Sequence, residues 1–299
     1  MSLPVDCTLG ETCHIQQFMD RDPGPDAQDF TCGPLSYDGH KGTDFALSTF
    51  AEMNAGVDVL AAAPGVVTGV RDGMADLLYT PERSAEIDGR DCGNGLVIDH
   101  GEGWVTQYCH LKKGTVAVAR GARVEKGDRL GEIGLSGRTQ FPHLHLSVRK
   151  DGREIDPFGT QDTNTCSLPL AGETALWTTP IPYTPGAIMT LGFSEMIPDY
   201  DAVQAGTASS TITPESPAFV LYAFAFGSRS GDRLVLSVDG PEGTLFSQDI
   251  TLERTQARFF RATGKRRSAP WPRGIYEGSA LLIRDDRVID SADIKISVD

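Results

Sequence analysis

Short runs of β-branched and other apolar residues, interrupted by glycine, fill the sequence between residues 40 and 158. Examples are VDVLAAAPGVVTGV, NGLVIDHGEGWVTQYCHL and VEKGDRLGEIGLSG. Glycine suits the tight turns between antiparallel strands because it adopts positive φ angles without a steric penalty. No long amphipathic helical pattern accompanies these runs. The segment is therefore predicted to form an all-β unit of short strands.

A second β-rich segment follows a change in composition. Residues 159–185 are rich in proline and threonine, which is typical of a linker. Beyond them cysteine and histidine are absent, and short alternating strands recur roughly every ten residues. This spacing favours a β-sandwich, immunoglobulin-like, over residues 186–299. We therefore expect a first domain over 1–168 with a disulfide-tied N-terminal lead-in, a linker over 169–185 and an accessory domain after it.

All six cysteines lie in the first 166 residues, and no Cys-x-x-Cys pair occurs. An even number without that motif favours disulfides in an exported domain over a zinc knuckle. Gly95–Asp99 and Trp104–Tyr108 are predicted to form a hairpin that brings Cys92 near Cys109, and the other pairings stay open. We expect a periplasmic or secreted protein. Because no signal peptide is visible, the chain is interpreted as a mature domain whose leader was removed.

The net charge of −14 disfavours nucleic acid and anionic membranes as partners. No apolar run is long enough to predict a membrane-spanning helix. Residues 1–39, rich in aspartate, proline and glycine, are expected to be irregular, with His14 exposed. The polar stretch 74–91 is interpreted as a loop insertion.

Four of the six histidines lie in short motifs whose residue types suit metal binding or proton transfer. His40 and Asp44 are four residues apart in YDGHKGTDFAL, where the glycines favour a turn and a strand over a helix. Imidazole and carboxylate are both zinc ligands, although a surface histidine and a turn-capping aspartate would give the same pattern. His143 and His145 are two apart in FPHLHLSVRK, so on a strand they share one face. His110 ends the strand-like run in QYCHLKKG.

Taken together, these residues indicate a catalytic zinc site. Two imidazoles and one carboxylate would leave the fourth position of a tetrahedral zinc ion open, which is the pattern of catalytic zinc. Two histidines would then remain for proton transfer, which imidazole performs near neutral pH.

The order of the motifs also resembles a known family. His-x-x-x-Asp, then Tyr-x-His-Leu, then Gly-x-Ser-Gly-x-x-x-x-Pro-His-Leu-His is similar to the lysostaphin-like, or LytM-type, zinc endopeptidases, over roughly half of the chain. The resemblance implies that His40, Asp44 and His145 bind Zn2+. It also implies that His110 and His143 are catalytic and flank the fourth position.

These enzymes cleave peptide bonds in bacterial peptidoglycan with an antiparallel β-sheet groove of the barrel-sandwich (duplicated hybrid motif) type. The resemblance therefore implies a zinc-dependent endopeptidase that acts on peptidoglycan stems or cross-links. Two alternatives remain open: a non-catalytic cell-wall-binding or amidase-activating protein that kept its ligands, and a secreted peptidase that cleaves glycine-rich proteins. The six cysteines and the insertion near 74–91 are not general features of the family.

Overall fold

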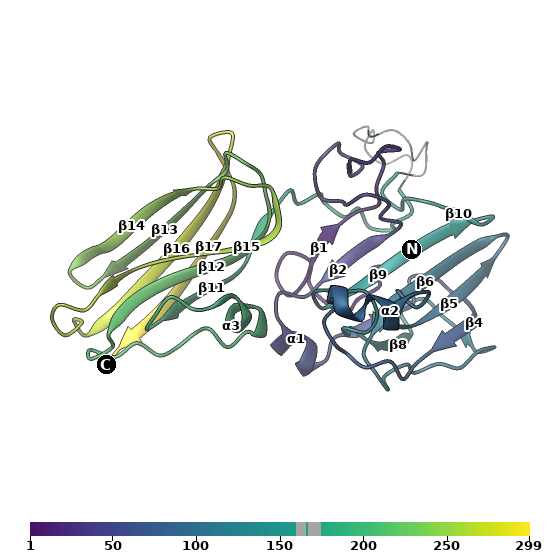
Figure 1. Ribbon diagram of the computed structural model, residues 1–299, viewed down its shortest axis with the longest axis horizontal. Coiled ribbons are helices and arrows are strands. Elements are labelled where there is room, and N and C mark those ends of the chain that lie inside the picture. Colours follow the sequence, from purple (N-terminus) through teal and green to yellow (C-terminus); the bar gives the residue numbers. More distant parts are fainter. Residues whose placement is uncertain (160–165, 167–174) are drawn as a thin grey trace. The chain divides into compact units, whose positions relative to one another are not determined.

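The computed structural model describes residues 1–159, 166 and 175–299 (Figure 1). The chain divides into two compact units, Met1–Tyr183 and Thr184–Asp299. Antiparallel sheets dominate both units, so the predicted all-β class is confirmed. The predicted linker lies partly outside the described residues, at 169–174. Of its described residues, Trp177 is buried and its ring lies 6.0 Å from that of Phe45 in the first unit.

The main sheet of the first unit runs in the order β1-β2-β9-β6-β5-β4-β7, with β10 paired to β9. Its strands are β1 (His14–Gln17), β2 (Thr43–Ala46), β4 (Gly65–Arg71), β5 (Asn94–Gly101), β6 (Trp104–Leu111), β7 (Arg123–Val124), β9 (His143–Lys150) and β10 (Arg153–Glu154). A separate pair joins β3 (Asp58–Leu60) to β8 (Arg129–Glu132). Because β9 lies between β2 and β6, it brings three distant motifs of the sequence side by side (Figure 1).

Two expectations for the N-terminal lead-in are wrong. The segment is not wholly irregular, because β1 pairs with β2 and extends the main sheet. His14, expected to be exposed, is only 7% exposed, since all four residues of this strand are buried. The lead-in therefore contributes a strand next to the one that carries Asp44.

The first unit also contains short helices, two of which lie in the predicted insertion. Thr49 begins α1 (Phe50–Ala55) with a capping box, in which its side chain accepts from the Glu52 N–H while the Glu52 carboxylate accepts from the Thr49 N–H. The stretch 74–91 contains η1 (Pro81–Arg83) and α2 (Ser84–Ile87). Its Tyr79 N–H donates to the Thr139 carbonyl, so the insertion lies against the loop that precedes β9.

Three disulfides tie the first unit together. Cys92 pairs with Cys109, as the predicted hairpin requires. The two pairings that the sequence left open are Cys7 with Cys13 and Cys32 with Cys166. The described part of the chain holds no free cysteine.

The disulfides should differ strongly in their effect on stability. Cys32–Cys166 closes a loop with a sequence separation of 134, against 6 for Cys7–Cys13. Loop-closure entropy predicts that replacing Cys32 and Cys166 by alanine lowers the free energy of unfolding by about 5 kcal/mol. Replacing Cys7 and Cys13 should lower it by only about 2 kcal/mol. Denaturant titration of the two double variants compares them, and equal losses would contradict the loop-size explanation.

The second unit is a β-sandwich. One sheet has the order β11-β12-β15 and the other β14-β13-β16-β17. The strands are β11 (Ala187–Ser194), β12 (Ala218–Ser228), β13 (Arg233–Gly240), β14 (Gly243–Thr251), β15 (Gln256–Arg266), β16 (Gly274–Arg284) and β17 (Arg287–Val298). Side chains from both sheets share one core, which includes Phe219, Leu234 and Leu282. On the other face of the three-stranded sheet, Val203 of α3 (Tyr200–Ala205) packs against Phe224.

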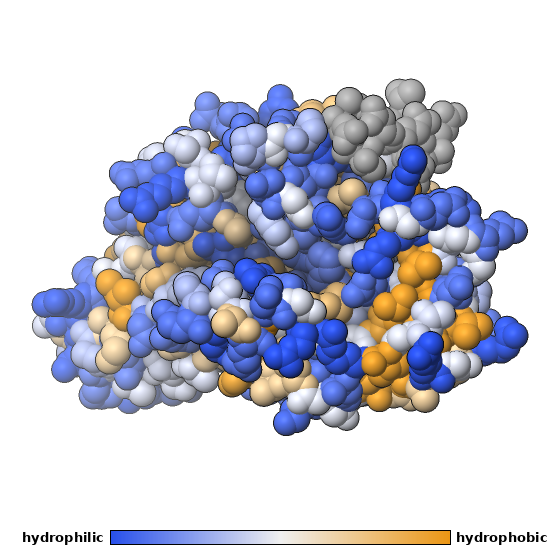
Figure 2. Space-filling view, turned by 45° about the vertical axis from the view of Figure 1, so that its right-hand side comes forward, coloured by the Kyte–Doolittle hydropathy of each residue, from blue (hydrophilic) through white to orange (hydrophobic). Residues whose placement is uncertain are grey.

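Hydrophilic residues cover most of the face drawn in Figure 2, as expected for a chain with a net charge of −14. Large apolar side chains that remain exposed in the first unit include Tyr37, Leu77 and Leu78. Among the described residues, no helix is both long enough and apolar enough to cross a membrane.

Candidate active site

The register of β2 and β9 places two of the predicted residues opposite each other. Asp44 pairs with His145, and Ala46 pairs with His143. Residues directly opposite on antiparallel strands project from the same face. The His-x-His and His-x-x-x-Asp motifs therefore meet because their strands are neighbours in the sheet.

His40 reaches this position from the turn that precedes β2. Its backbone N–H donates to the Tyr37 carbonyl at 3.0 Å, within a turn that contains Gly39 at a φ of 72°. The Tyr37 ring stacks on the His40 imidazole with 4.4 Å between centroids. The imidazole itself is buried, with 2% of the residue exposed.

Three side-chain atoms form a compact cluster. His40 Nε2 lies 3.1 Å from Asp44 Oδ1 and 3.1 Å from His145 Nδ1, and the last two atoms are 2.8 Å apart. Donor atoms bound to a tetrahedral zinc ion at 2.0–2.2 Å are about 3.3 Å from one another, so a small outward shift would admit the ion. The donor set, two imidazoles and one carboxylate, also fits zinc.

The second nitrogen of each imidazole in the three-atom cluster has its own partner. His40 Nδ1 lies 2.7 Å from the Phe18 carbonyl, and because a carbonyl only accepts, Nδ1 carries the proton. His145 Nε2 lies 3.0 Å from Ser147 Oγ. These contacts orient both rings. His40 Nε2 is left without a proton, and Ser147 Oγ can accept the proton of His145 Nε2, which would leave His145 Nδ1 free to bind a metal ion.

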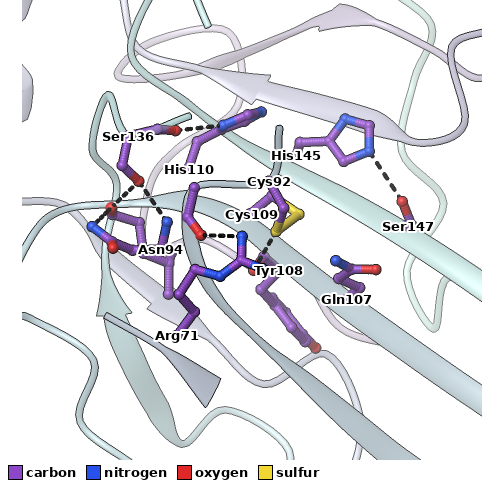
Figure 3. The surroundings of a disulfide bond; sticks show 12 residues. Arg71, Cys92, Asn94, Gln107, Tyr108, Cys109, His110, Ser136, His145 and Ser147 are labelled. Atoms are coloured by element: carbon purple, nitrogen blue, oxygen red, sulfur yellow. Dashed lines mark hydrogen bonds between the residues drawn. A yellow bond between two sulfur atoms is a disulfide. The ribbon is translucent and has the colours of Figure 1, made fainter. Parts of the chain in front are cut away.

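His110 adjoins the cluster from β6. Its Nδ1 donates to the Ser136 carbonyl at 2.8 Å, so its Nε2 carries the lone pair (Figure 3). The ring centroid lies 4.6 Å from that of His143 and 6.1 Å from that of His145. The backbone of His110 has a φ of 65°, which is unusual for a residue other than glycine.

His143 has the same arrangement of proton and lone pair. Its Nδ1 lies 2.9 Å from the Phe141 carbonyl and 3.1 Å from Thr139 Oγ1. Its Nε2 faces the three-atom cluster and lies 3.5 Å from Asp44 Oδ1. The structure thus brings together all five of the residues that the sequence singled out.

Electrostatics favour a charged Asp44 carboxylate and neutral imidazoles at His110 and His143. Burial opposes ionisation of Asp44, but the nearby His40 and His143 hold the pKa of its carboxyl well below the usual value. Burial, together with His143 and His145, holds the pKa of His110 well below its usual value. Burial also lowers the pKa of His143, against the opposing charge of Asp44. At neutral pH both His110 and His143 are therefore ready to accept a proton.

Two further polar residues of β5 and β6, His100 and Tyr108, make hydrogen bonds within the fold. The Tyr108 hydroxyl accepts from the Ala62 N–H at 2.9 Å, and the residue is fully buried. His100 contacts the Pro64 carbonyl at 2.7 Å and Thr106 Oγ1 at 2.8 Å, at the end of the β5–β6 hairpin. These contacts give Tyr108 a packing role and His100 a role at the turn.

Sequence reasoning missed the groups that orient the imidazoles. Three are main-chain carbonyls, those of Phe18, Ser136 and Phe141, and such a contact leaves no trace in the residue type. Ser147 is two residues after His145 on the same strand, so the strand period could have identified it. Gly42 was visible within the first motif, but the reason for a glycine there lies in its packing.

Gly42 should tolerate no side chain. A Cβ at this position would lie 2.6 Å from His145 Nε2 and 2.6 Å from the Leu146 carbonyl oxygen. We therefore expect Gly42→Ala to displace the His145 imidazole and to weaken zinc binding about 10–100-fold, the range known for residues that orient metal ligands. Competition with a chelator measures the affinity. Gly69→Ala on β4 is the matched control, since its Cβ would make only an ordinary contact with Val97, at 3.8 Å. Equal zinc affinity in the two variants would contradict the expectation.

Comparison with known proteins agrees with this geometry. The model of peptidase family M23 matches residues 38–157. Peptidoglycan DD-endopeptidase ShyA of Vibrio cholerae is 32% identical over 130 residues, 44% of this chain and 25% of the relative. DD-carboxypeptidase/endopeptidase Mpg of Neisseria meningitidis is 31% identical over 120 residues, 40% of this chain and 22% of the relative.

Among solved structures, the catalytic domain of the prophage-encoded M23 protein EnpA from Enterococcus faecalis is similar at 22% identity and a TM-score of 0.35. It covers 50% of this chain and 92% of that one. The chain spans about a quarter of the length of the two curated relatives. The matched segment contains all five residues of the site, and the chain thus carries a domain of peptidase family M23 over residues 38–157.

Proposed function

We propose that this protein is a zinc-dependent endopeptidase that hydrolyses peptide bonds in peptidoglycan stems or cross-links. The observation that carries the proposal is the cluster of His40 Nε2, Asp44 Oδ1 and His145 Nδ1, with two neutral imidazoles beside it. The names of the matched relatives, which include peptidoglycan DD-endopeptidases, support the choice of substrate.

The three clustered side chains would hold the zinc ion. When bound, zinc lowers the pKa of a coordinated water molecule to about 7 and polarises a carbonyl group. Asp44 supplies the negative charge that favours a cation at this buried position. The Phe18 carbonyl and the Ser147 hydroxyl would hold the two rings so that His40 Nε2 and His145 Nδ1 could bind the ion.

His110 and His143 would move the protons. Peptide hydrolysis requires a base that takes a proton from the attacking water and an acid that protonates the leaving amine. Both imidazoles hold their Nδ1 proton on a carbonyl and present Nε2 as the basic atom. We assign these two roles to the pair, because their ring centroids are only 4.6 Å apart and either can exchange protons with the same substrate.

We further propose a periplasmic or secreted location and a two-domain organisation. Three disulfides fit an oxidising compartment, and peptidoglycan lies outside the cytoplasm. Residues 1–168 would form the peptidase domain and 186–299 an accessory domain, joined by 169–185.

Turnover on purified sacculi, compared with turnover on an oligoglycine-containing protein, tests the proposal. We expect the full chain to release soluble muropeptides from sacculi and to leave the oligoglycine protein intact. Cleavage of the protein alone would instead identify a peptidase of glycine-rich proteins. Zinc binding without cleavage of either substrate would indicate a non-catalytic wall-binding or amidase-activating protein.

A further inference from the structure

The strand that carries His110 contains a β-bulge at this residue. In the β5–β6 ladder, Asn94 pairs with Leu111 and Leu96 pairs with Tyr108, with a register shift between them. One residue of β5, Gly95, therefore faces two residues of β6, Cys109 and His110. Bulges of this kind redirect a side chain and are common beside active sites.

The bulge decides which way the His110 imidazole points. Cys109 is the direct partner of His145 across β6 and β9, so these two residues share one face of the sheet. In an unbroken strand His110 would point to the opposite face. The positive φ of His110 breaks this alternation and allows its ring to approach that of His143.

Hydrogen bonds from two segments hold His110 in this unfavourable conformation. Its backbone N–H donates to the Cys92 carbonyl at 2.8 Å, and its carbonyl accepts from the Gly134 N–H at 2.9 Å. Its ring donates to the Ser136 carbonyl. The positions of the Cys92 and Ser136 carbonyls therefore determine the conformation of His110.

The segments that supply these two carbonyls pack directly on each other. A Cβ on Gly93 would lie 2.4 Å from Ser136 backbone atoms, and one on Gly137 would lie 2.2 Å from the Asp91 carbonyl oxygen. The Asn94 N–H donates to Ser136 Oγ at 2.9 Å. A shift of Cys92 would consequently move both acceptors of His110.

We propose that the Cys92–Cys109 disulfide is a positioning device for His110. It joins the bulge covalently to the segment that supplies the Cys92 carbonyl, and it lies beside both His110 and His145 (Figure 3). Without the bond, the bulge could relax toward a regular strand and turn the His110 ring away from His143. The inference rests on the proposed catalytic role of His110 and assigns to this disulfide a function beyond stability.

Replacing both Cys92 and Cys109 by alanine tests the proposal in the full chain, with the Cys7→Ala/Cys13→Ala variant as the matched control. On sacculi we expect kcat to fall about 10–100-fold with KM and zinc content unchanged, while the control keeps its kcat. Unchanged kcat in the Cys92/Cys109 variant would overturn the proposal.

The same replacement in a His110→Ala background separates positioning from a general structural effect. If the disulfide acts through His110, its loss should have no further effect on kcat once the imidazole is gone. An equal loss of kcat in both backgrounds would contradict the inference.

Hydrogen exchange of the His110 amide gives a readout that does not depend on activity or metal. We expect this amide to exchange at least about tenfold faster in the Cys92/Cys109 variant, while the Leu146 amide in β9 is unaffected. Unchanged protection of His110 would refute the positioning role. Wild-type protein that fails to cleave sacculi would instead refute the proposed function, and the exchange result would still decide the inference.

Should the double variant fail to fold, selective reduction provides the same comparison. Cys92 is half-buried and lines an open pocket of about 240 Å3, so a reductant can reach it. Mass mapping would first confirm that only this disulfide is reduced in the folded wild-type protein. Hydrogen exchange of the His110 amide would then be measured. Faster exchange is expected, and unchanged exchange would refute the positioning role.

Discussion

Asp44→Ala should reduce bound zinc from about one ion per chain to a trace and remove peptidoglycan cleavage. The carboxylate is buried, lies within 3.1 Å of His40 Nε2 and His145 Nδ1, and carries the only negative charge in the three-atom cluster. Loss of the metal removes several kcal/mol of transition-state stabilisation, so turnover should fall by at least about 10³-fold.

Two controls separate metal loss from unfolding. Asp44→Asn keeps the shape of the side chain and should remain folded, yet it should bind zinc much more weakly because the charge is gone. Asp99→Ala removes an exposed carboxylate on β5 that accepts from the Gly101 N–H, and should keep both zinc and activity. Metal analysis by mass spectrometry together with circular dichroism gives the comparison. Full zinc occupancy in Asp44→Ala would exclude Asp44 as a ligand.

His110→Ala and His143→Ala should each keep zinc but lose about 10²–10⁴-fold in turnover. Neither imidazole belongs to the three-atom cluster, and each holds its Nδ1 proton on a carbonyl so that Nε2 is free to accept another. Burial is the main cause that lowers the pKa of each, so both imidazoles are neutral at pH 7.

His100→Ala is the matched control for these histidines, since it lies in the same unit but outside the three-atom cluster, and its ring nitrogens contact the Pro64 carbonyl and Thr106 Oγ1. It should keep its turnover. Measurement of zinc content and kcat in His40, His110, His143 and His145 variants then tests the division of roles. If zinc content fell equally in all four, the separation into ligands and proton carriers would be wrong.

The sequence predicted the parts of the site that depend on strand periodicity. Two histidines two residues apart indicated one face of the strand that is β9, and the motif that contains Asp44 indicated a second strand; that the two strands pair was learned from the structure. The predicted hairpin also placed Cys92 near Cys109. These features follow from the alternation of side chains along a strand, which a single segment of sequence carries.

Features that arise from packing between distant segments could not be predicted. The bulge at His110 depends on how Gly95 faces two residues of β6. The pairing of Cys32 with Cys166 depends on tertiary contacts that bring the lead-in to the end of the domain. His14 was placed at the surface because its surroundings are polar in sequence, whereas pairing of its strand with β2 buries it.

Release of peptides from purified peptidoglycan, with the metal removed and restored, tests the central claim most directly. Mass analysis of the soluble fragments would be made with zinc-loaded protein, with protein stripped by a chelator, and with stripped protein to which zinc is returned. We predict fragments with newly formed amino and carboxyl termini in stems or cross-links, their loss on chelation and their return with zinc. No release under any condition, or release that chelation leaves unchanged, would contradict the account.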